Sequence, residues 1–374
     1  MTNTPLHIVI IGLALSSSWG NGHATTYRAL LRGLHAEGHD VLFLERDVPW
    51  YAKNRDLAEP DFCTLAYYDT IDDLLGTYGD AIRFADAVII GSYVPEGAKV
   101  IDAVSTLNPS RFCFYDIDTP VTLAALARGE EEFLEARQIA GFEAYFSFTG
   151  GPILTRLEQT YGVPRAFPLY CSVDGDRYRP TGEPLVWDLG YLGTYSPDRQ
   201  PTLERLLIEP ARRLPEMRFV VAGPQYPEGI DWPDNVERID HLPPTEHASF
   251  YSRQRFTLNV TRADMIAAGW SPSVRLFEAA ACGSPIISDA WPGLSDLLPD
   301  GEAILIARDT EDVVAALTGL DEGRRLAIAT AARSRILESH TGDARARQLV
   351  SDLQSLALRG NATTAPAVRQ RVSA

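Results

Sequence analysis

The sequence predicts an α/β protein built from two doubly wound domains, each a parallel sheet with helices on both faces. Short, continuous apolar runs alternate with longer amphipathic segments in both halves, as buried parallel strands alternate with covering helices. The chain has 374 residues, which exceeds what one ordinary hydrophobic core organises. A stretch near the middle is rich in Asp, Gly and Pro and lacks apolar periodicity, which is typical of a linker.

The N-terminal half begins with a strand, a loop of small residues and a helix. The predicted strand covers 7–13, the loop covers 16–23, and the helix covers 24–37 and ends at Gly38. A second strand at 40–45 completes the strand–loop–helix–strand order of a Rossmann-like domain. Because the loop lacks the Gly-x-Gly-x-x-Gly pattern, it gives a nicotinamide cofactor little support.

Both halves continue this alternation. The remaining strands of the first half are predicted at 86–91, 111–115, 143–148 and 165–169, with helices after Pro95, over 120–140 with a break near Gly129, and over 150–161. In the second half, strands are predicted at 188–192, 218–222, 235–239, 256–260, 286–288 and 303–306, with helices over 200–213, 246–253 and most of 309–358. We therefore predict an N-terminal domain over 1–170, a linker over 171–180 and a C-terminal domain over 181–340. A disordered tail over 360–374 is predicted from its polar, small-residue composition.

One helix of the second half is marked at both ends by its residue types. Ser271 suits the N-cap, and Pro272 suits the first helical position, where its missing N–H costs nothing. Gly283 suits a left-handed C-terminal cap, and Pro285 stops the helix from continuing.

The open start of this helix predicts chemistry. Free N–H groups and the macrodipole make a helix N-terminus an anion site. Arg275 is permanently charged, and Glu278 lies three residues on, so both project from roughly one face. A phosphate at the helix start, with a carboxylate nearby for sugar hydroxyls, would hold a nucleotide-sugar. A surface ion pair between Arg275 and Glu278 on an ordinary helix explains the same residues.

The sequence of this helix resembles a known family. The run from Arg275 to Pro285, Arg-x-x-Glu-Ala-x-Ala-Cys-Gly-x-Pro, is followed by Ser-Asp and by a Gly-Leu pair. It resembles the donor-site segment of group-1 GT-B glycosyltransferases and is most similar to the CgeB-like group. The resemblance implies that Glu278 binds the ribose hydroxyls of the donor. A second glutamate of the wider family, eight positions earlier, falls at Trp270, which is not acidic.

The resemblance extends over nearly all of the chain and implies two domains that face a cleft. Val173-Asp174 and the Tyr178-x-Pro180 ending resemble the interdomain segment of the family. The N-terminal domain would hold the acceptor and the C-terminal domain the nucleotide-sugar. A helix over 341–359 would cross back to the first domain, as is usual in the family.

Donor-binding residues are expected at the carboxyl ends of the second set of strands, where open parallel sheets bind ligands. The candidates are Gly193, Arg199, Gln225, Arg262, Ser271, Ser273, Arg275 and Glu278. Arg199 also matches, approximately, the basic residue that holds the donor diphosphate in the family. Fixed arginines and a helix end would stabilise the leaving diphosphate without a metal ion. Asp116 and Asp118 have the spacing of a metal site, but their context suggests a loop that faces the cleft.

The candidate catalytic residues lie in the first half. His23 would take a proton from an acceptor hydroxyl, because imidazole titrates near neutrality. His23 would otherwise cap the following helix or bind a phosphate, and Asp118 is a rival base. The loop residues expected to contact the acceptor are Trp19, Gly20, Asn21 and Gly22. Trp19 and Trp270 would stack on a sugar or base, or serve packing alone.

Composition narrows the partners. The formal net charge of −16 argues against nucleic acid and against simple attraction to anionic lipid. No segment reaches transmembrane length, and the four separated cysteines, Cys63, Cys113, Cys171 and Cys282, are expected as buried thiols of a cytoplasmic protein.

The resemblance implies a hexosyltransferase without a cofactor. UDP-sugars are a base-rate choice of donor, and a saccharide, a lipid-linked sugar or a protein would be the acceptor. Retention or inversion stays open. A nucleotide-sugar epimerase or a non-catalytic sugar- or nucleotide-binding protein of a cell-surface assembly stays an alternative. A phosphorylase with pyridoxal phosphate is disfavoured, because neither Lys53 nor Lys99 lies near the donor segment.

Overall fold

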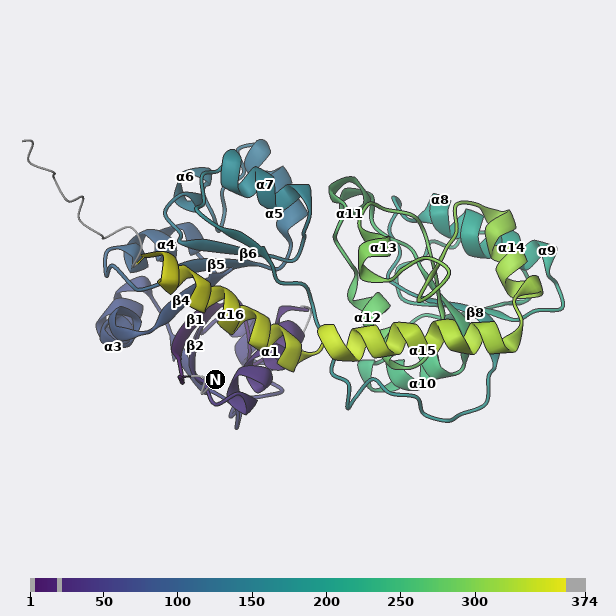
Figure 1. The fold of residues 1–374 in the computed structure, drawn as a ribbon, viewed down its shortest axis with the longest axis horizontal. Helices are drawn as coiled ribbons and strands as arrows, with labels where there is room; N and C mark the ends of the chain where they lie inside the picture. Colours follow the sequence, from purple (N-terminus) through teal and green to yellow (C-terminus); the bar gives the residue numbers. More distant parts are fainter. Residues whose placement is uncertain (1–3, 19–21, 361–374) are drawn as a thin grey trace, which may run out of the picture.

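The computed structural model describes residues 4–18 and 22–360, and within them it contains two parallel sheets with helices packed around them (Figure 1). The seven-stranded sheet has the order β3-β2-β1-β4-β5-β6-β7, and the six-stranded sheet has the order β10-β9-β8-β11-β12-β13. In each sheet the order reverses beside the first strand of the set, which is the Rossmann arrangement. The predicted fold class is therefore confirmed.

The strands follow the apolar runs of the sequence closely. The first sheet contains β1 His7–Gly12, β2 Asp40–Arg46, β3 Thr64–Tyr68, β4 Ala87–Gly91, β5 Phe112–Asp116, β6 Ala144–Ser147 and β7 Ala166–Pro168. The second contains β8 Trp187–Leu192, β9 Phe219–Ala222, β10 Val236–Ile239, β11 Gln254–Asn259, β12 Ile286–Ser288 and β13 Leu305–Ile306. The central strands β1 and β4 are buried on both faces, which explains their uninterrupted apolar sequence.

The helices connect these strands and cover both sheets. Those of the first part are α1 His23–Ala36, α2 Pro49–Ala52, α3 Ile71–Phe84, α4 Gly97–Ser105, α5 Thr119–Ala127, α6 Ala136–Ile139 and α7 Pro152–Gln159. Those of the second part are α8 Gln200–Leu203, a π-helix Glu204–Ile208, α9 Glu209–Arg213, a 3₁₀ helix Pro244–Glu246, α10 His247–Ser252, α11 Ala263–Ala268, α12 Val274–Ala281, α13 Leu294–Leu297, α14 Thr310–Gly319, α15 Glu322–Ser339 and α16 Gly342–Gly360. The predicted helix over 120–140 is two helices, α5 and α6, separated by 128–135.

Several elements were not predicted. Residues 47–85 lack a predicted element, yet they contain α2, β3 and α3. Strand β3 lies at the edge of its sheet, and only one of its five residues is fully buried, so its apolar signal is weak. Helix α11 is also absent from the predicted elements, because none of its six residues is fully buried and it therefore has no apolar face.

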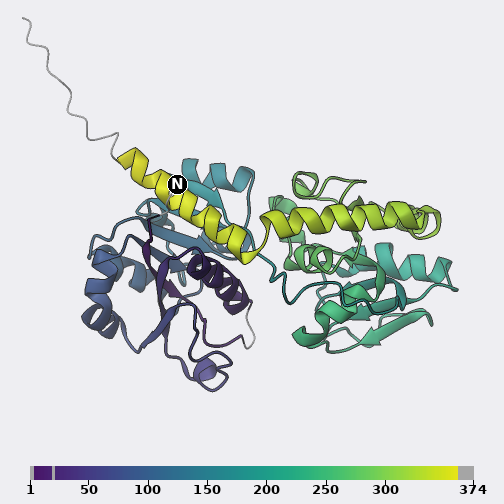
Figure 2. The ribbon, with the colours of Figure 1, turned by 60° about the horizontal axis from the view of Figure 1, so that its bottom comes forward.

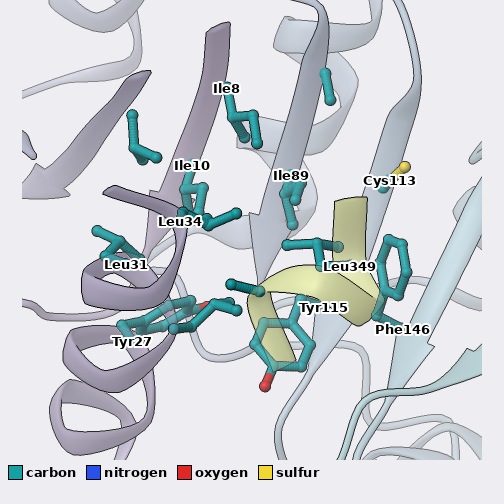
Figure 3. Packing of buried hydrophobic residues seen from close by; sticks show 14 of the residues in the cluster. Ile8, Ile10, Tyr27, Leu31, Leu34, Ile89, Cys113, Tyr115, Phe146 and Leu349 are labelled. Carbon is teal, nitrogen blue, oxygen red and sulfur yellow. The ribbon is translucent and has the colours of Figure 1, made fainter. Parts of the chain in front are cut away.

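Helix α16 lies across the first sheet although it comes from the end of the described chain (Figure 2). Its Leu349 packs in the same cluster as Ile10 of β1 and Leu34 of α1 (Figure 3). A Cβ at Gly33 would lie 2.6 Å from the carbonyl oxygen of Gly342, so these two glycines allow α1 and α16 to touch. The apolar face of α16 is therefore buried against α1 and the first sheet, which holds this last described helix on the N-terminal part of the chain.

The marked helix of the second half, α12, starts later than predicted. Ser273, not Ser271, is its N-cap residue, and Val274 is the first helical residue. Ser271 is instead buried, and its hydroxyl accepts a hydrogen bond from Thr149 in the loop after β6. The C-terminal cap is confirmed, because Gly283 has φ +73° and its N–H donates to the carbonyl oxygen of Ala280.

Two further predictions concern the burial of the four cysteines and the absence of a segment of transmembrane length. Cys113, Cys171 and Cys282 are free and buried, whereas Cys63 is free but only half-buried, so the expectation of four buried thiols is wrong for Cys63. It packs at the margin of the first core cluster. In the described ranges, 4–18 and 22–360, no helix is both long and apolar enough to cross a membrane.

Candidate active site

A cavity of about 700 Å³ lies between the two sheets, where the carboxyl ends of several strands meet. The first sheet contributes the start of α1, the start of α5 and the loop after β6, and the second contributes α11 and the start of α12. The chain passes from the first sheet to the second through residues 171–180, here called the crossing segment; residues of this segment and of α10 complete the wall. A cleft at this edge of two Rossmann-like sheets is the expected place for a ligand.

The start of α12 is held by a buried polar network. Asn259, at the end of β11, accepts hydrogen bonds from Ser273 Oγ and Arg275 Nη1, each at 2.9 Å. Its side-chain amide donates to Thr261 and Ser288. Because both the oxygen and the nitrogen of the Asn259 side-chain amide have partners, the network fixes the orientation of the helix start.

Arg275 lies beside the cavity and is not among the described residues that line it. Its Nε donates to the carbonyl oxygen of Leu192 at 2.6 Å, and its guanidinium carbon lies 4.8 Å from the centre of the Tyr191 ring. Arg275 and Glu278 are both described, and they form no ion pair; the Glu278 carboxylate instead contacts His247 and Tyr251. The alternative of an Arg275–Glu278 surface ion pair is therefore wrong.

Arg275 belongs to a group of arginines around Tyr226. Burial raises the pKa of Tyr226, and the charges of Arg238, Arg199 and Arg275 offset part of that rise. The Arg238 guanidinium lies 4.2 Å from the Tyr226 ring centre. The Arg199 guanidinium donates to Thr194 O at 2.5 Å, and its buried Nε has no partner among the described residues. Three guanidinium groups therefore gather where β8 and β9 end.

Two candidate donor residues accompany this arginine group. Tyr226 Oη donates to the carbonyl oxygen of Gly193 at 3.1 Å, and a Cβ at Gly193 would lie 2.9 Å from Arg275 Nη2. Gln225 has an exposed side chain and φ +70°. Gly193, Gln225, Arg199 and Arg275 are all absent from the described cavity wall, which Arg262, Ser271, Ser273 and Glu278 do line.

Glu278 projects into the cavity one turn along α12. Its carboxylate accepts a hydrogen bond from Tyr251 Oη at 3.0 Å, and its side chain is 12% exposed. Burial raises its pKa, and hydrogen bonds from Tyr178 and Tyr251 offset part of the rise. His247 Nδ1 lies 4.0 Å from the same carboxylate. The two tyrosines hold a carboxylate in place at the wall, ready to accept from a hydroxyl.

His23 is the first residue of α1 and lines the opposite wall. It is 8% exposed, its Nδ1 has no partner among the described residues, and its ring meets Tyr93 edge-to-face at 5.3 Å. Burial lowers the pKa of His23 to about 4. The imidazole is therefore neutral at neutral pH and able to accept a proton.

Asp118 stands at the start of α5, on the same wall as His23. Tyr93 Oη donates to its Oδ2 at 3.4 Å, so one tyrosine adjoins both candidate bases. Loss of surrounding water raises the pKa of Asp118, and the Tyr93 hydrogen bond and the charge of Arg262 across the cavity offset part of the rise.

The prediction that Asp116 lies in a loop facing the cleft is wrong, because its side chain does not reach the cavity. It is fully buried and accepts hydrogen bonds from Tyr145 Oη at 2.5 Å and from Thr122 at 2.9 Å. Burial raises its pKa to about 6. Among the described residues no group of three His, Cys, Asp or Glu side chains has the arrangement of a metal site.

The loop before α1 is only partly described. Trp19, Gly20 and Asn21, which were predicted to contact the acceptor, lie outside the described residues. Gly22 is the N-cap residue of α1 and lines the cavity, with no side chain to cap the helix.

Trp270 serves packing at the junction of the two sheets. Its ring lies where a Cβ at Gly151 or Gly293 would be, 2.4 Å from the nearest ring atom in each case. Its indole N–H donates to Asp296 at 2.9 Å, and its backbone has φ +42°. The side chain borders a separate cavity of about 360 Å³ and is not among the described residues that line the larger one.

Sequence reasoning missed part of the wall. His247 was read as a structural or surface residue, and Tyr178 as part of a linker, yet both line the cavity beside Glu278. Arg177, an exposed residue of the same segment, also lines it. Arg238, of the arginine group, had no signal because it lies in a short edge strand.

Comparison with known proteins gives a partial match in sequence. Residues 199–351 match a family model described as glycosyl transferase-like. A D-inositol 3-phosphate glycosyltransferase of Mycobacterium leprae is 32% identical over 147 residues, which are 35% of this chain and 34% of that protein. The corresponding protein of Mycolicibacterium paratuberculosis is 31% identical over 188 residues, which are 45% of this chain and 42% of that protein. The chain thus spans well under half the length of the curated relatives it matches.

Comparison with solved structures covers nearly the whole chain. A sucrose-phosphate synthase of Thermosynechococcus elongatus matches with a TM-score of 0.66 and 14% identity, over 95% of this chain and 100% of that chain. Anabaena HepE in complex with UDP-glucose matches with a TM-score of 0.63 and 11% identity, over 94% and 100%. At these identities the likeness concerns the fold, and the narrower CgeB-like assignment stays a prediction. The chain has the two-domain GT-B fold of known glycosyltransferases, and its residues 199–351 match the glycosyl transferase-like family.

Proposed function

We propose that this chain is a metal-independent, cofactor-independent glycosyltransferase that moves a sugar from a nucleoside diphosphate sugar to a hydroxyl acceptor. The observation that carries the proposal is the start of α12, where an anchored helix N-terminus and the Glu278 carboxylate meet one cavity. The match of residues 199–351 to the glycosyl transferase-like family supports it. In this proposal 181–340 hold the donor and 1–170 hold the acceptor.

The donor's charges suit the second sheet's side of the cavity. The start of α12 lines the cavity and offers free N–H groups, and the arginine group around Tyr226 lies beside the described part of the wall. Together they would supply fixed positive charge for a diphosphate. Glu278, held by Tyr251, would accept hydrogen bonds from the ribose hydroxyls. UDP-sugars are the first donors to try, because Anabaena HepE and an alpha-glucosyltransferase of the same fold were solved with UDP-glucose.

The transfer step needs a base on the facing wall. The acceptor oxygen would bond to the anomeric carbon while its proton passes to His23 or Asp118. The bond between that carbon and the diphosphate oxygen would break, and the nucleoside diphosphate would leave with the electron pair. His23, with a pKa lowered to about 4, is neutral at neutral pH and meets the requirement that the base be unprotonated. Asp118 lines the same wall and is the rival base.

Calorimetric titration with UDP, GDP, ADP, dTDP and CDP, each with EDTA and then with magnesium, tests the donor site. We expect one diphosphate to bind in EDTA, and Arg275→Ala to weaken that binding by roughly 1.5–3 kcal/mol, the value of a charged hydrogen bond. Arg213→Ala is the matched control, because Arg213 pairs with Glu209 and Glu311 on the surface of the same part of the chain. The proposal fails if no diphosphate binds, or if both variants bind equally well.

A hydrolysis assay separates the alternatives. A transferase releases the nucleoside diphosphate slowly from its sugar donor even without acceptor. An epimerase would interconvert donor sugars without releasing diphosphate, and a non-catalytic binding protein would leave the donor unchanged. Release that continues in EDTA supports the metal-independent proposal, and release that requires magnesium contradicts it.

A further inference from the structure

The first sheet's side of the cavity carries no positively charged side chain among the residues described there. Its apolar residues are Ile117, Pro120, Val121 and Phe148, its uncharged polar residues are Thr25, Thr26 and Thr149, and His23 and Asp118 are its titratable groups. This wall is where the proposed function puts the acceptor, so the inference rests on that function.

Exposed apolar side chains continue across the cavity. Val121 of α5 is 41% exposed and Val274 of α12 is 42% exposed, and both line the cavity. The other large apolar side chains that are exposed in the described chain, Trp50, Phe84, Leu185 and Leu326, are not among the residues of this wall. Met265 of α11 adds to the same surface, and α11 packs against α5. A ligand with an apolar body would remove this surface from water.

The positively charged side chains that line the described cavity lie on its other side, and Arg262 faces Asp118 across it. Arg262 precedes α11, and Arg177 lies in the crossing segment that also carries Tyr178, which lines the wall beside Glu278. On the acceptor wall His23 is neutral at neutral pH, and Asp118 is an acid that offers an anion no positive charge. The start of α1 offers backbone N–H groups, but no charged side chain to pair with a phosphate. An anionic acceptor therefore finds no built partner on this wall.

We infer that the acceptor is an uncharged alcohol with an apolar body, and not a phosphorylated polyol. Its hydroxyl lies at His23 and Asp118, and its apolar part lies against Val121, Val274 and Met265. This differs from what the names of the mycobacterial relatives state for those proteins, whose acceptor is inositol 3-phosphate.

The test compares matched acceptors with the sugar donor whose diphosphate binds in calorimetry. The acceptors are 4-nitrophenyl β-D-glucopyranoside, glucose and glucose 6-phosphate. We expect kcat/KM for the aryl glucoside to exceed that for glucose at least about tenfold, and glucose 6-phosphate to be the poorest acceptor. Equal values for the aryl glucoside and glucose, or a preference for glucose 6-phosphate, would overturn the inference.

Val121→Arg tests the wall itself, with Leu326→Arg as its control. Both residues are exposed helical positions, 41% and 50% exposed, and Leu326 is not among the cavity residues. Val121→Arg should lower kcat/KM for the aryl glucoside about tenfold and strengthen glucose 6-phosphate binding, with UDP binding unchanged. Leu326→Arg should change none of these. Equal effects of the two substitutions would contradict the inference.

Saturation-transfer NMR of the aryl glucoside gives a readout that needs no turnover. Its signal should disappear in Val121→Arg and persist in Leu326→Arg. If a diphosphate binds but the aryl glucoside signal is absent or unaffected by Val121→Arg, the inference fails and the proposed function stands. If no diphosphate binds, the proposed function fails, and the inferred acceptor fails with it.

Discussion

Thr149 Oγ1 donates a hydrogen bond to Ser271 Oγ over 3.2 Å, and both hydroxyls are buried between the two sheets. Next to them the N–H of Gly150 donates to the carbonyl oxygen of Trp270 at 2.9 Å. These two bonds join the loop after β6 to the segment before α12. The first sheet therefore helps to position the helix that carries Arg275 and Glu278.

Ser271→Ala removes the hydroxyl bond between the sheets. The free energy of unfolding should fall by about 1 kcal/mol, because Thr149 loses its buried partner. Urea denaturation measures it. Ser105→Ala, an exposed hydroxyl bonded only within its own helix turn, serves as the control and should leave the unfolding midpoint unchanged. A Ser271→Ala variant as stable as this control would show that the bond contributes nothing.

Glu278→Gln keeps the size of the side chain and removes its charge. Calorimetric affinity for UDP should fall about tenfold or more, because a hydrogen bond to a charged group contributes about 1.5–3 kcal/mol. Affinity for inorganic pyrophosphate should not change, since that ligand has no ribose. Glu246→Gln, at an exposed position just before α10, is the matched control. Equal losses for UDP and pyrophosphate would assign Glu278 to the diphosphate instead.

Trp270→Glu places the family's acidic residue in this chain. We expect it to destabilise the protein by about 3–5 kcal/mol, the range for truncating a large aromatic side chain, because the space between Gly151 and Gly293 would lose its ring. Differential scanning calorimetry measures the change. Donor hydrolysis by the folded fraction should not rise, since the side chain borders the smaller cavity. A stable variant with faster hydrolysis would refute the packing role.

His23→Asn changes how stability depends on pH. Burial lowers the pKa of folded His23 to about 4, below its ordinary value of 6.5. Protonation of His23 is therefore easier in the unfolded chain and favours unfolding. As pH falls from 6.5 to 4, the free energy of unfolding should decrease by up to about 3 kcal/mol because of this residue. Burial also lowers the pKa of His340, to about 3, so His340 contributes a loss of stability in acid as well. That contribution is present in both the wild type and His23→Asn, so it does not account for a difference between them. Denaturation at pH 7.5 and 4.5 should show a smaller acid loss in the variant than in wild type.

The two candidate bases can be separated by kinetics. Removing a general base lowers kcat about 10²–10⁴-fold, whereas removing a neighbour lowers it much less. We expect the larger loss in His23→Asn, because its imidazole is neutral and its Nδ1 has no competing partner among the described residues. A larger loss in Asp118→Asn, at unchanged UDP affinity, would assign the base to Asp118. Transfer rates at saturating donor, measured at pH 7.5, decide between them.

Some of the site followed from local sequence. The cap at Gly283 and the spacing of Arg275 and Glu278 on one helix depend only on residues a few positions apart, so the pattern revealed them. Ser271 did not follow in the same way. Its residue type suits an N-cap, but burial against Thr149 recruits its hydroxyl, and the cap passes to Ser273.

Other parts depend on contacts between distant segments. His247 and Tyr178 are far apart in sequence from Glu278, and only the packing of α10 and the crossing segment on α12 brings them to its carboxylate. The lowered pKa of His23 depends likewise on burial beneath Tyr93, which no local pattern encodes.

By itself the sequence determined the fold class, the strand and helix order around most of both sheets, and the helix that carries Arg275 and Glu278. These features arise from hydrophobic periodicity and capping, which act over a few neighbouring residues. Only the tertiary structure decided that Trp270 packs between glycines, that Arg238 joins Arg199 and Arg275, and that the described residues on one wall of the cavity include no cation. The reason is physical: burial, charge and cavity shape are set by side chains that folding brings together from remote parts of the chain.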